Sequence, residues 1–337
     1  MKFKIGDGAD MKKQHNKLAW VALSLAPVVL SAPAHSETLR IDGLYPARAK
    51  NVATIESISI ERFGGSDGTD LSFEIEDQLS GLEIGGVPYF RVIAARSAIA
   101  PDATMAGTAT ASVEEFKVKE YRDICIERND KDKCEKRESR EVTCLKRIID
   151  FRARYRMSRY SDGQNIYSQS KSDSHEQSVC LRDESFSSQE KIIQNMIGKM
   201  AQNVRFDLAP VERSQSIRVL ESRKDMDKDT AKLFKAAVKM TKKDEREACR
   251  MWDSTAENKA PHQSLLFNQG LCAEQAGQLD RAISLYRQAD QLGRSKIEIR
   301  QAIQRANDHQ TALADWDLRM ETLSNRNAGK LAAGERN

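Results

Sequence analysis

The side chains that could do chemistry in this chain are six cysteines, a few histidines and scattered carboxylates. The histidines beyond residue 36 are His175, His262 and His309. His175 lies in the polar run Ser-Asp-Ser-His-Glu, which is typical of a solvated turn rather than of a general base. The carboxylates of residues 114–120 lie among lysines on a predicted strand, so a solvated face explains them better than a glycosidase pair.

The sequence contains no glycine loop for a nucleotide and no G-x-S-x-G turn for a serine nucleophile. We therefore expect no catalytic residues, no cofactor and no bound metal. The alternative from a different class is an envelope hydrolase or another enzyme, whose site would form from residues far apart in sequence. An enzyme would show a deep pocket with convergent polar groups, whereas an adaptor would show a long groove along residues 230–310.

The cysteines are spaced for disulfides rather than for zinc. Their number is even, and the gaps between them are 9, 10, 36, 69 and 23 residues, without a Cys-x-x-Cys pair. In an exported chain such a set indicates disulfides. The cysteines are Cys125, Cys134, Cys144, Cys180, Cys249 and Cys272.

The first four cysteines lie in or after a predicted β-hairpin. Cys125 and Cys144 are placed symmetrically about the predicted turn region, so they could face each other across the ladder. Cys134 could then reach Cys180. The other two ways of pairing these four cysteines stay open.

The first 36 residues predict export. Lys12, Lys13 and Lys17 precede an uncharged, mostly apolar run at residues 18–30, and the small residues that follow allow cleavage after Ala34 or Ser36. A helix of 13 residues rises only about 20 Å, so a transmembrane anchor across a core of about 30 Å is the weaker interpretation. We expect a periplasmic protein without a stable membrane span. The run that begins at Met11 is a more natural start than Met1.

The charge balance gives no support to a nucleic-acid-binding class. The chain has 54 basic and 50 acidic residues, and residues 1–36 hold five lysines against two aspartates. The remainder is therefore nearly neutral, which gives no argument for nucleic acid or an anionic membrane as the partner. About 300 residues after a signal peptide suit two domains.

Residues 37–222 alternate between strand and helix patterns. Strands are predicted at 52–62, 89–94, 106–126, 142–160, 166–171 and 216–220, and helices at 69–82 and 188–204. The charged run at 129–133 predicts the turn between the two long strands. The expected fold is α+β, a small α/β sandwich with an extended antiparallel ribbon that carries cysteines.

Four segments of this region resemble one family. They are VATIESISIE at 52–61, YFRVIA at 89–94, AGTA at 106–109 and the strand from Tyr155 to Ser168. Together they are similar to the curli secretion channel and penicillin-binding-protein activator superfamily, over about residues 40–220. The resemblance implies a fold and an envelope setting, and it carries over no catalytic residue. This chain departs from those lipoproteins because its first cysteine is Cys125.

The C-terminal part matches itself at a spacing of 34 residues. Ala236 matches Gly270, Ala248 matches Ala282, and Trp252 matches Tyr286. This period and these residue types resemble the tetratricopeptide repeat over residues 229–318, in which a small residue lets two helices approach and an aromatic fills the gap. We expect two repeats and a capping helix within an all-α domain at 223–322, followed by a flexible tail at 323–337.

The repeats predict a disulfide and a binding groove. Cys249 and Cys272 fall on adjacent helices near their seam, where a disulfide would staple a short array. The first helices of the repeats and the cap would line a mixed apolar groove for a protein segment. Its residues would be Leu233, Ala237, Met240, Phe267, Leu271, Glu274, Gln275, Gln301 and Arg305.

These observations favour an interaction or scaffold protein of the periplasm. Its helical repeats would hold a protein partner of the cell envelope, and its first domain would join an envelope assembly. A homo-oligomer is a further expectation, because two repeats need additional packing.

Overall fold

The computed structural model describes residues 37–95, 97–180, 185–257 and 259–334. The predicted signal peptide lies outside the described residues. The described part is a mixed α/β structure with one large sheet and seven helices. None of these helices combines the length and the apolar character that crossing a membrane requires.

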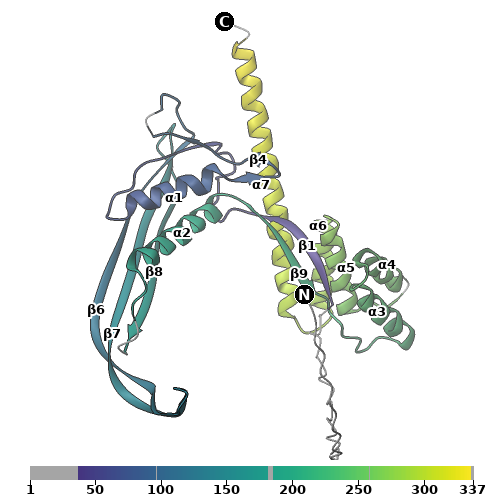
Figure 1. Cartoon of the computed structure of the whole chain (residues 1–337). Coiled ribbons are helices and arrows are strands. Elements are labelled where there is room, and N and C mark those ends of the chain that lie inside the picture. The colour runs from purple at the N-terminus through teal and green to yellow at the C-terminus, as the bar shows by residue number, and fades with distance from the viewer. Residues whose placement is uncertain (1–36, 96, 181–184, 258, 335–337) are drawn as a thin grey trace, which may run out of the picture. The chain divides into compact units, whose positions relative to one another are not determined.

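The large sheet has five strands and two covering helices. Its strands, in spatial order, are β5 (Arg91–Ile93), β2 (Ser57–Ile60), β6 (Ala103–Arg128), β7 (Cys134–Arg159) and β8 (Asn165–Val179). β2 is parallel to β5 and β6, while β6, β7 and β8 are antiparallel. Helices α1 (Gly68–Ser80) and α2 (Gln189–Leu208) lie on the same face of this sheet (Figure 1).

Alternation along the strands explains the position of the first core. On β7, Phe151, Ala153, Tyr155 and Met157 are buried against the helices, while the residues between them are exposed or partly exposed. Apolar residues of both helices complete this core, namely Leu71, Ile75, Leu79, Met196, Met200 and Val204. β8 continues eight residues beyond the predicted strand at 166–171.

A separate two-stranded ribbon consists of β1 (Thr38–Tyr45) and β9 (Val211–Arg218), paired antiparallel at eight registers. β1 was not predicted, although Leu39 and Ile41 alternate with polar residues. β9 begins five residues before the predicted strand at 216–220. A short hairpin, β3 (Glu83–Ile84) and β4 (Val87–Pro88), follows α1.

Four helices form two antiparallel pairs. They are α3 (Lys228–Met240), α4 (Glu245–Ala256), α5 (Gln263–Gln275) and α6 (Leu279–Gln291). A Cβ atom at Gly270 would lie 2.4 Å from the Tyr286 ring, so only glycine allows α5 and α6 to approach this closely. Trp252 is fully buried beside Phe234 in the first pair, but Ala236, the match of Gly270, is exposed.

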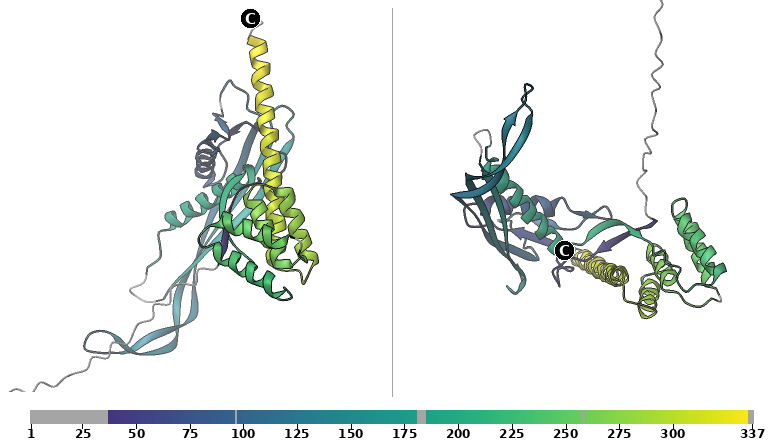
Figure 2. Two further views of the ribbon diagram at one scale, coloured as in Figure 1. Left: turned by 90° about the vertical axis from the view of Figure 1, so that its right-hand side faces the viewer. Right: turned by 90° about the horizontal axis from the view of Figure 1, so that it is seen from below.

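The last helix, α7 (Ile297–Gly334), spans the predicted capping helix and residues 323–334 of the predicted flexible tail, whose last three residues lie outside the described part of the chain. The left view of Figure 2 shows it as one helix without a break. Its second half is fixed by polar contacts to the loops around the sheet. The Arg319 guanidinium donates to the carbonyl oxygens of Ala53, Ile55 and Tyr89, and Arg326 forms an ion pair with Asp102 at 2.8 Å.

The structure contains three disulfides, Cys125–Cys134, Cys144–Cys180 and Cys249–Cys272. The favoured pairing of Cys125 with Cys144 was therefore wrong, as was that of Cys134 with Cys180. The reason is the register of the hairpin, which turns at residues 129–133. Cys125 lies opposite Arg137, and Cys144 lies opposite Val118.

Candidate partner-binding site

The predicted groove residues lie at the second core of the molecule and are mostly covered. Ala237, Phe267, Leu271 and Glu274 are buried, and Arg305 is nearly so. Met240 and Gln275 are half-buried, while Leu233 and Gln301 are exposed. The remaining members of this core include Leu39 and Ile41 of β1, both without exposed surface. The chain's own strand therefore covers the surface predicted for a partner.

Side chains of the helices hold this ribbon through its backbone. Gln275 Nε2 donates to the Arg40 carbonyl oxygen at 2.9 Å, and the Arg40 amide donates to the Glu245 carboxylate at 3.3 Å. The Asn268 side chain forms two hydrogen bonds with the backbone of Leu220, at 2.9 and 3.0 Å. Such contacts replace those that a bound extended peptide would make. A partner groove at these residues is closed in this structure.

A buried ion pair lies beneath β1. Both nitrogen atoms of the Arg305 fork lie 2.7 Å from Glu274 oxygens, and the Tyr286 hydroxyl donates to the same carboxylate at 2.6 Å. Burial raises the pKa of Tyr286, and the Glu274 carboxylate raises it further. Burial has the largest single influence on the pKa of Arg305 and lowers it, but the hydrogen bond and the charge attraction to Glu274 act together to raise it overall. These predicted groove residues hold α5, α6 and α7 together and are not available to a ligand.

The three histidines that were considered as candidate catalytic residues have different surroundings. His175 is exposed. His262 caps α5, because its Nδ1 accepts from the Ser264 amide at 3.1 Å. His309 packs against Gly43 of β1, its Nδ1 is buried without a hydrogen-bond partner, and burial lowers its pKa. In the described part of the chain, none of these rings has a serine or cysteine nucleophile recorded as its hydrogen-bond partner.

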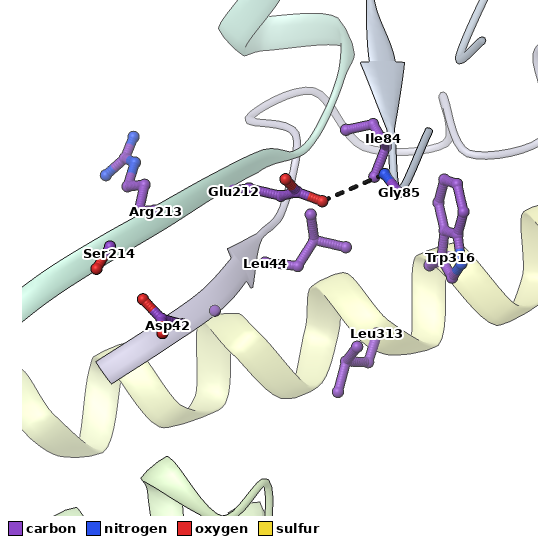
Figure 3. A pocket seen from close by; sticks show the side chains of 10 residues that line it. Asp42, Leu44, Ile84, Gly85, Glu212, Arg213, Ser214, Leu313 and Trp316 are labelled. Carbon is purple, nitrogen blue, oxygen red and sulfur yellow. Dashed lines mark hydrogen bonds between the residues drawn. The ribbon is translucent and has the colours of Figure 1, made fainter. Parts of the chain in front are cut away.

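An open recess lies where α7 passes the ribbon and the β3–β4 hairpin (Figure 3). It has a volume of about 670 Å³, and Leu44, Leu313 and Trp316 form its apolar wall. Trp316 also stacks on Tyr89, with ring centroids 6.3 Å apart, which fixes the indole. The Leu313 side chain remains 40% exposed. We call this recess the α7 cleft.

Polar groups surround the apolar wall of the α7 cleft. Glu212 accepts from the Gly85 amide at 3.3 Å, a contact drawn in Figure 3. Asp42 forms an ion pair with Arg40 at 3.0 Å. The two carboxylates are thus engaged in local contacts, and the ten lining residues include no histidine, cysteine or lysine. This arrangement suits an apolar side chain that is held by shape and by polar contacts at the edge.

Sequence reasoning missed the α7 cleft. Its apolar wall combines Leu44 of the unpredicted β1 with Leu313 and Trp316, which are far away in the sequence. The alternation of Leu39 and Ile41 was the available signal for β1.

One cluster has metal-ligand residue types. Atoms of Glu120, Cys144 and Cys180 lie within 4.8 Å of one another. Cys144 and Cys180 are joined in a disulfide, so neither sulfur is a thiolate that could bind a metal. The Glu120 carboxylate accepts from the Ser178 hydroxyl at 2.6 Å and contacts Arg122.

Two solved structures resemble the chain weakly. No protein-family model matches the chain, and no curated protein matches it. A putative neuraminyllactose-binding hemagglutinin homolog from Helicobacter pylori is 14% identical, with a TM-score of 0.32, over 49% of this chain and 89% of that chain. A minor lipoprotein from Acinetobacter baumannii is 12% identical, with a TM-score of 0.22, over 46% of this chain and 90% of that chain.

Proposed function

We propose that this chain is an exported interaction protein of the cell envelope and that it acts by binding a protein partner. The observation that carries this proposal is the α7 cleft, where a partly exposed leucine and a fixed tryptophan lie side by side in an open recess. Clustered large apolar side chains at the surface mark sites of protein interaction. The partner would insert an apolar side chain between Leu313 and Trp316.

The helical pairs then have a different role from the one predicted. Their spacing of 34 residues resembles a tetratricopeptide array, and the Gly270–Tyr286 contact has the packing expected of one. Their inner face holds β1, so they position the wall of the cleft. Three disulfides suit an oxidising compartment, in line with the periplasmic location expected from residues 1–36.

Site-specific photo-crosslinking in the native cell tests the cleft. A photoreactive phenylalanine analogue at Leu313 should give an adduct of defined mass with one envelope protein. The matched control is Leu292, which is 47% exposed at the end of α6 and lies outside the cleft. Equal adducts at both positions, or none at Leu313, would contradict the proposal.

A second measurement tests the compartment. The N-terminal sequence of the purified natural protein should begin at His35 or Glu37, after signal peptidase cleavage. A natural protein that begins at Met1 or Met11 would contradict export.

A further inference from the structure

Three arginines follow one another along the outer face of the sheet. Arg152, Arg154 and Arg156 are exposed, while Ala153 and Tyr155 between them are buried on the helix-covered side. Side chains on one face of a strand recur at intervals of about 6.8 Å, so the three guanidinium groups form a row along β7. In Figures 1 and 2, α1 and α2 lie on the opposite face. We call this row the arginine row.

The arginine row forms no recorded ion pair in the described part of the chain, although Asp150 lies two residues before Arg152 on the same face of β7. Among the described residues, none of its three side chains has a recorded hydrogen bond or ion pair, whereas Arg147 and Arg159 on the same strand pair with Glu115 and Asp162. Three adjacent cations that lack partners create a positive potential above the sheet. Such a potential attracts an anion from outside the molecule.

The strands on both sides carry hydroxyl groups at the same registers. On β6 the residues opposite the row are Ala106, Thr108 and Thr110, and on β8 they are Ser168, Ser170 and Ser172. Five of these six neighbours can donate and accept hydrogen bonds, and none is acidic. Neighbouring strands are about 4.8 Å apart, so each arginine has a hydroxyl within reach of the same ligand group.

A recess lies over two of the three registers, those of Arg154 and Arg156. It has a volume of about 390 Å³ and is lined by Thr108, Arg154, Arg156, Ser168 and Ser170 among others. This volume is in the range of small-ligand sites. β7 is paired on both sides, so no peptide strand can add to its backbone.

The three registers also lack the protein side chains that bind nucleic acids or anionic membranes. No aromatic side chain of the row or its six neighbours is available for stacking on nucleotide bases. No large apolar side chain points outward there to insert into a bilayer. Guanidinium groups bind carboxylates and phosphates in bidentate fashion, and the flanking hydroxyls suit a ligand that itself carries hydroxyls.

We propose that the arginine row binds an anionic glycan, a carbohydrate chain with carboxylate or phosphate groups, which lies along β7. This site is separate from the α7 cleft, so the chain would hold a protein with one surface and a glycan with the other. Neither proposal requires the other to be correct.

Calorimetric titration of the full mature chain tests the site. The probes are an oligogalacturonate for carboxylates and a phosphomannan for phosphates, with neutral maltohexaose as the uncharged control. At least one anionic glycan should bind, with affinity that falls as salt rises, and maltohexaose should not bind. The ratio of the two affinities identifies the preferred anion.

Substitution locates the binding. Arg152→Gln, Arg154→Gln and Arg156→Gln combined should weaken glycan binding by at least about tenfold, because charge-assisted hydrogen bonds are lost. The control removes the same charge from α3 with Lys232→Gln, Lys235→Gln and Lys239→Gln, all exposed residues, and should leave affinity within about twofold. An unchanged melting temperature in both variants shows that the fold is intact.

Three results would overturn the inference. One is the absence of binding by either anionic glycan at millimolar concentration. Another is equal loss of affinity in the β7 and α3 variants. The last is binding of polyglutamate, a single-stranded oligonucleotide or phosphatidylglycerol vesicles as tightly as the better glycan, since each would assign the row to another class of polyanion.

Discussion

Two arginines of α7 and the arginine row of β7 are the same residue type in opposite situations. Arg305 and Arg319 of α7 are buried, where Arg305 meets a carboxylate and Arg319 meets three carbonyl oxygens. The three side chains of the arginine row are exposed and have no recorded partner among the described residues. The difference teaches that a count of basic residues says little about charge available to a ligand. The nearly neutral total hides a local row of unpaired cations.

The cost of burial explains the contrast. A guanidinium that leaves water loses several kcal/mol of solvation, so it persists in the interior only with a well-placed acceptor. Arg305 and Arg319 satisfy this condition, which makes them architectural. Arg154 keeps its solvation and is free to exchange water for an external anion.

The largest effect should come from breaking the buried pair. Glu274→Ala leaves Arg305 buried without its carboxylate, and we expect a loss of about 3–5 kcal/mol in the free energy of unfolding. Urea denaturation of the purified chain measures it. The double variant Glu274→Leu, Arg305→Met removes both charges and should recover most of the loss. A double variant as unstable as the single one would mean that lost packing, and not the unpaired charge of Arg305, causes the loss in the free energy of unfolding.

Removal of Arg319 should have the next largest effect. Arg319→Met leaves the buried carbonyl oxygens of Ala53, Ile55 and Tyr89 without their donor, which should cost about 2–3 kcal/mol. Hydrogen exchange should then rise in the second half of α7 before it rises in α5. Arg300→Met, on the exposed side of the same helix, is the control and should change neither quantity.

Acid should weaken the contact between β1 and α7 by a smaller amount. Burial lowers the pKa of His309 below its usual value of 6.5, so the unfolded chain takes up this proton first. Stability should therefore fall as the pH drops below about 6.5 and be unaffected by this group at higher pH. His309→Gln should remove this component from the pH profile of the melting temperature. An identical profile in the variant would contradict it.

The smallest effect on stability should be that of Arg154→Met, the same substitution as at Arg319. The free energy of unfolding should stay within about 0.5 kcal/mol of the parent value, because an exposed side chain without partners is removed. Parallel urea curves for the two variants make the comparison direct. A loss at Arg154 as large as that at Arg319 would show an unrecognised structural role for the arginine row.

The sequence predicted those elements whose pattern is long and local. The alternation along residues 142–160 indicated the strand that buries Phe151 and Tyr155, and the 34-residue spacing indicated the contact of Gly270 with Tyr286. Both patterns arise within one element or between neighbouring helices, so spacing alone is enough to reveal them.

The rest depended on partners far away in the sequence. The face of α5 with Phe267 and Leu271 was recognised as apolar, but spacing cannot tell whether a partner or the chain's own β1 covers it. The end of α7 was taken as a tail because only the loops near residues 53–56 and 102 give Arg319 and Arg326 their partners. The disulfide pairing is a different case, because the turn at 129–133 was predicted correctly but a ladder about that turn places Arg137, not Cys144, opposite Cys125.

β1 has a consequence for the order of folding. Gln275 donates a hydrogen bond to the Arg40 carbonyl oxygen, and the two residues are 235 positions apart in the sequence. Arg319 donates to the Ala53 carbonyl oxygen, 266 positions away. Closing such loops costs entropy before any contact repays it, so folding through them is slow. A chain that is synthesised from its N-terminus presents β1 long before α5 and α7 exist. The two-stranded ribbon should therefore be the last element to fold. Until it folds, the apolar side chains of Leu39 and Ile41 are exposed and must be kept from aggregating with other chains.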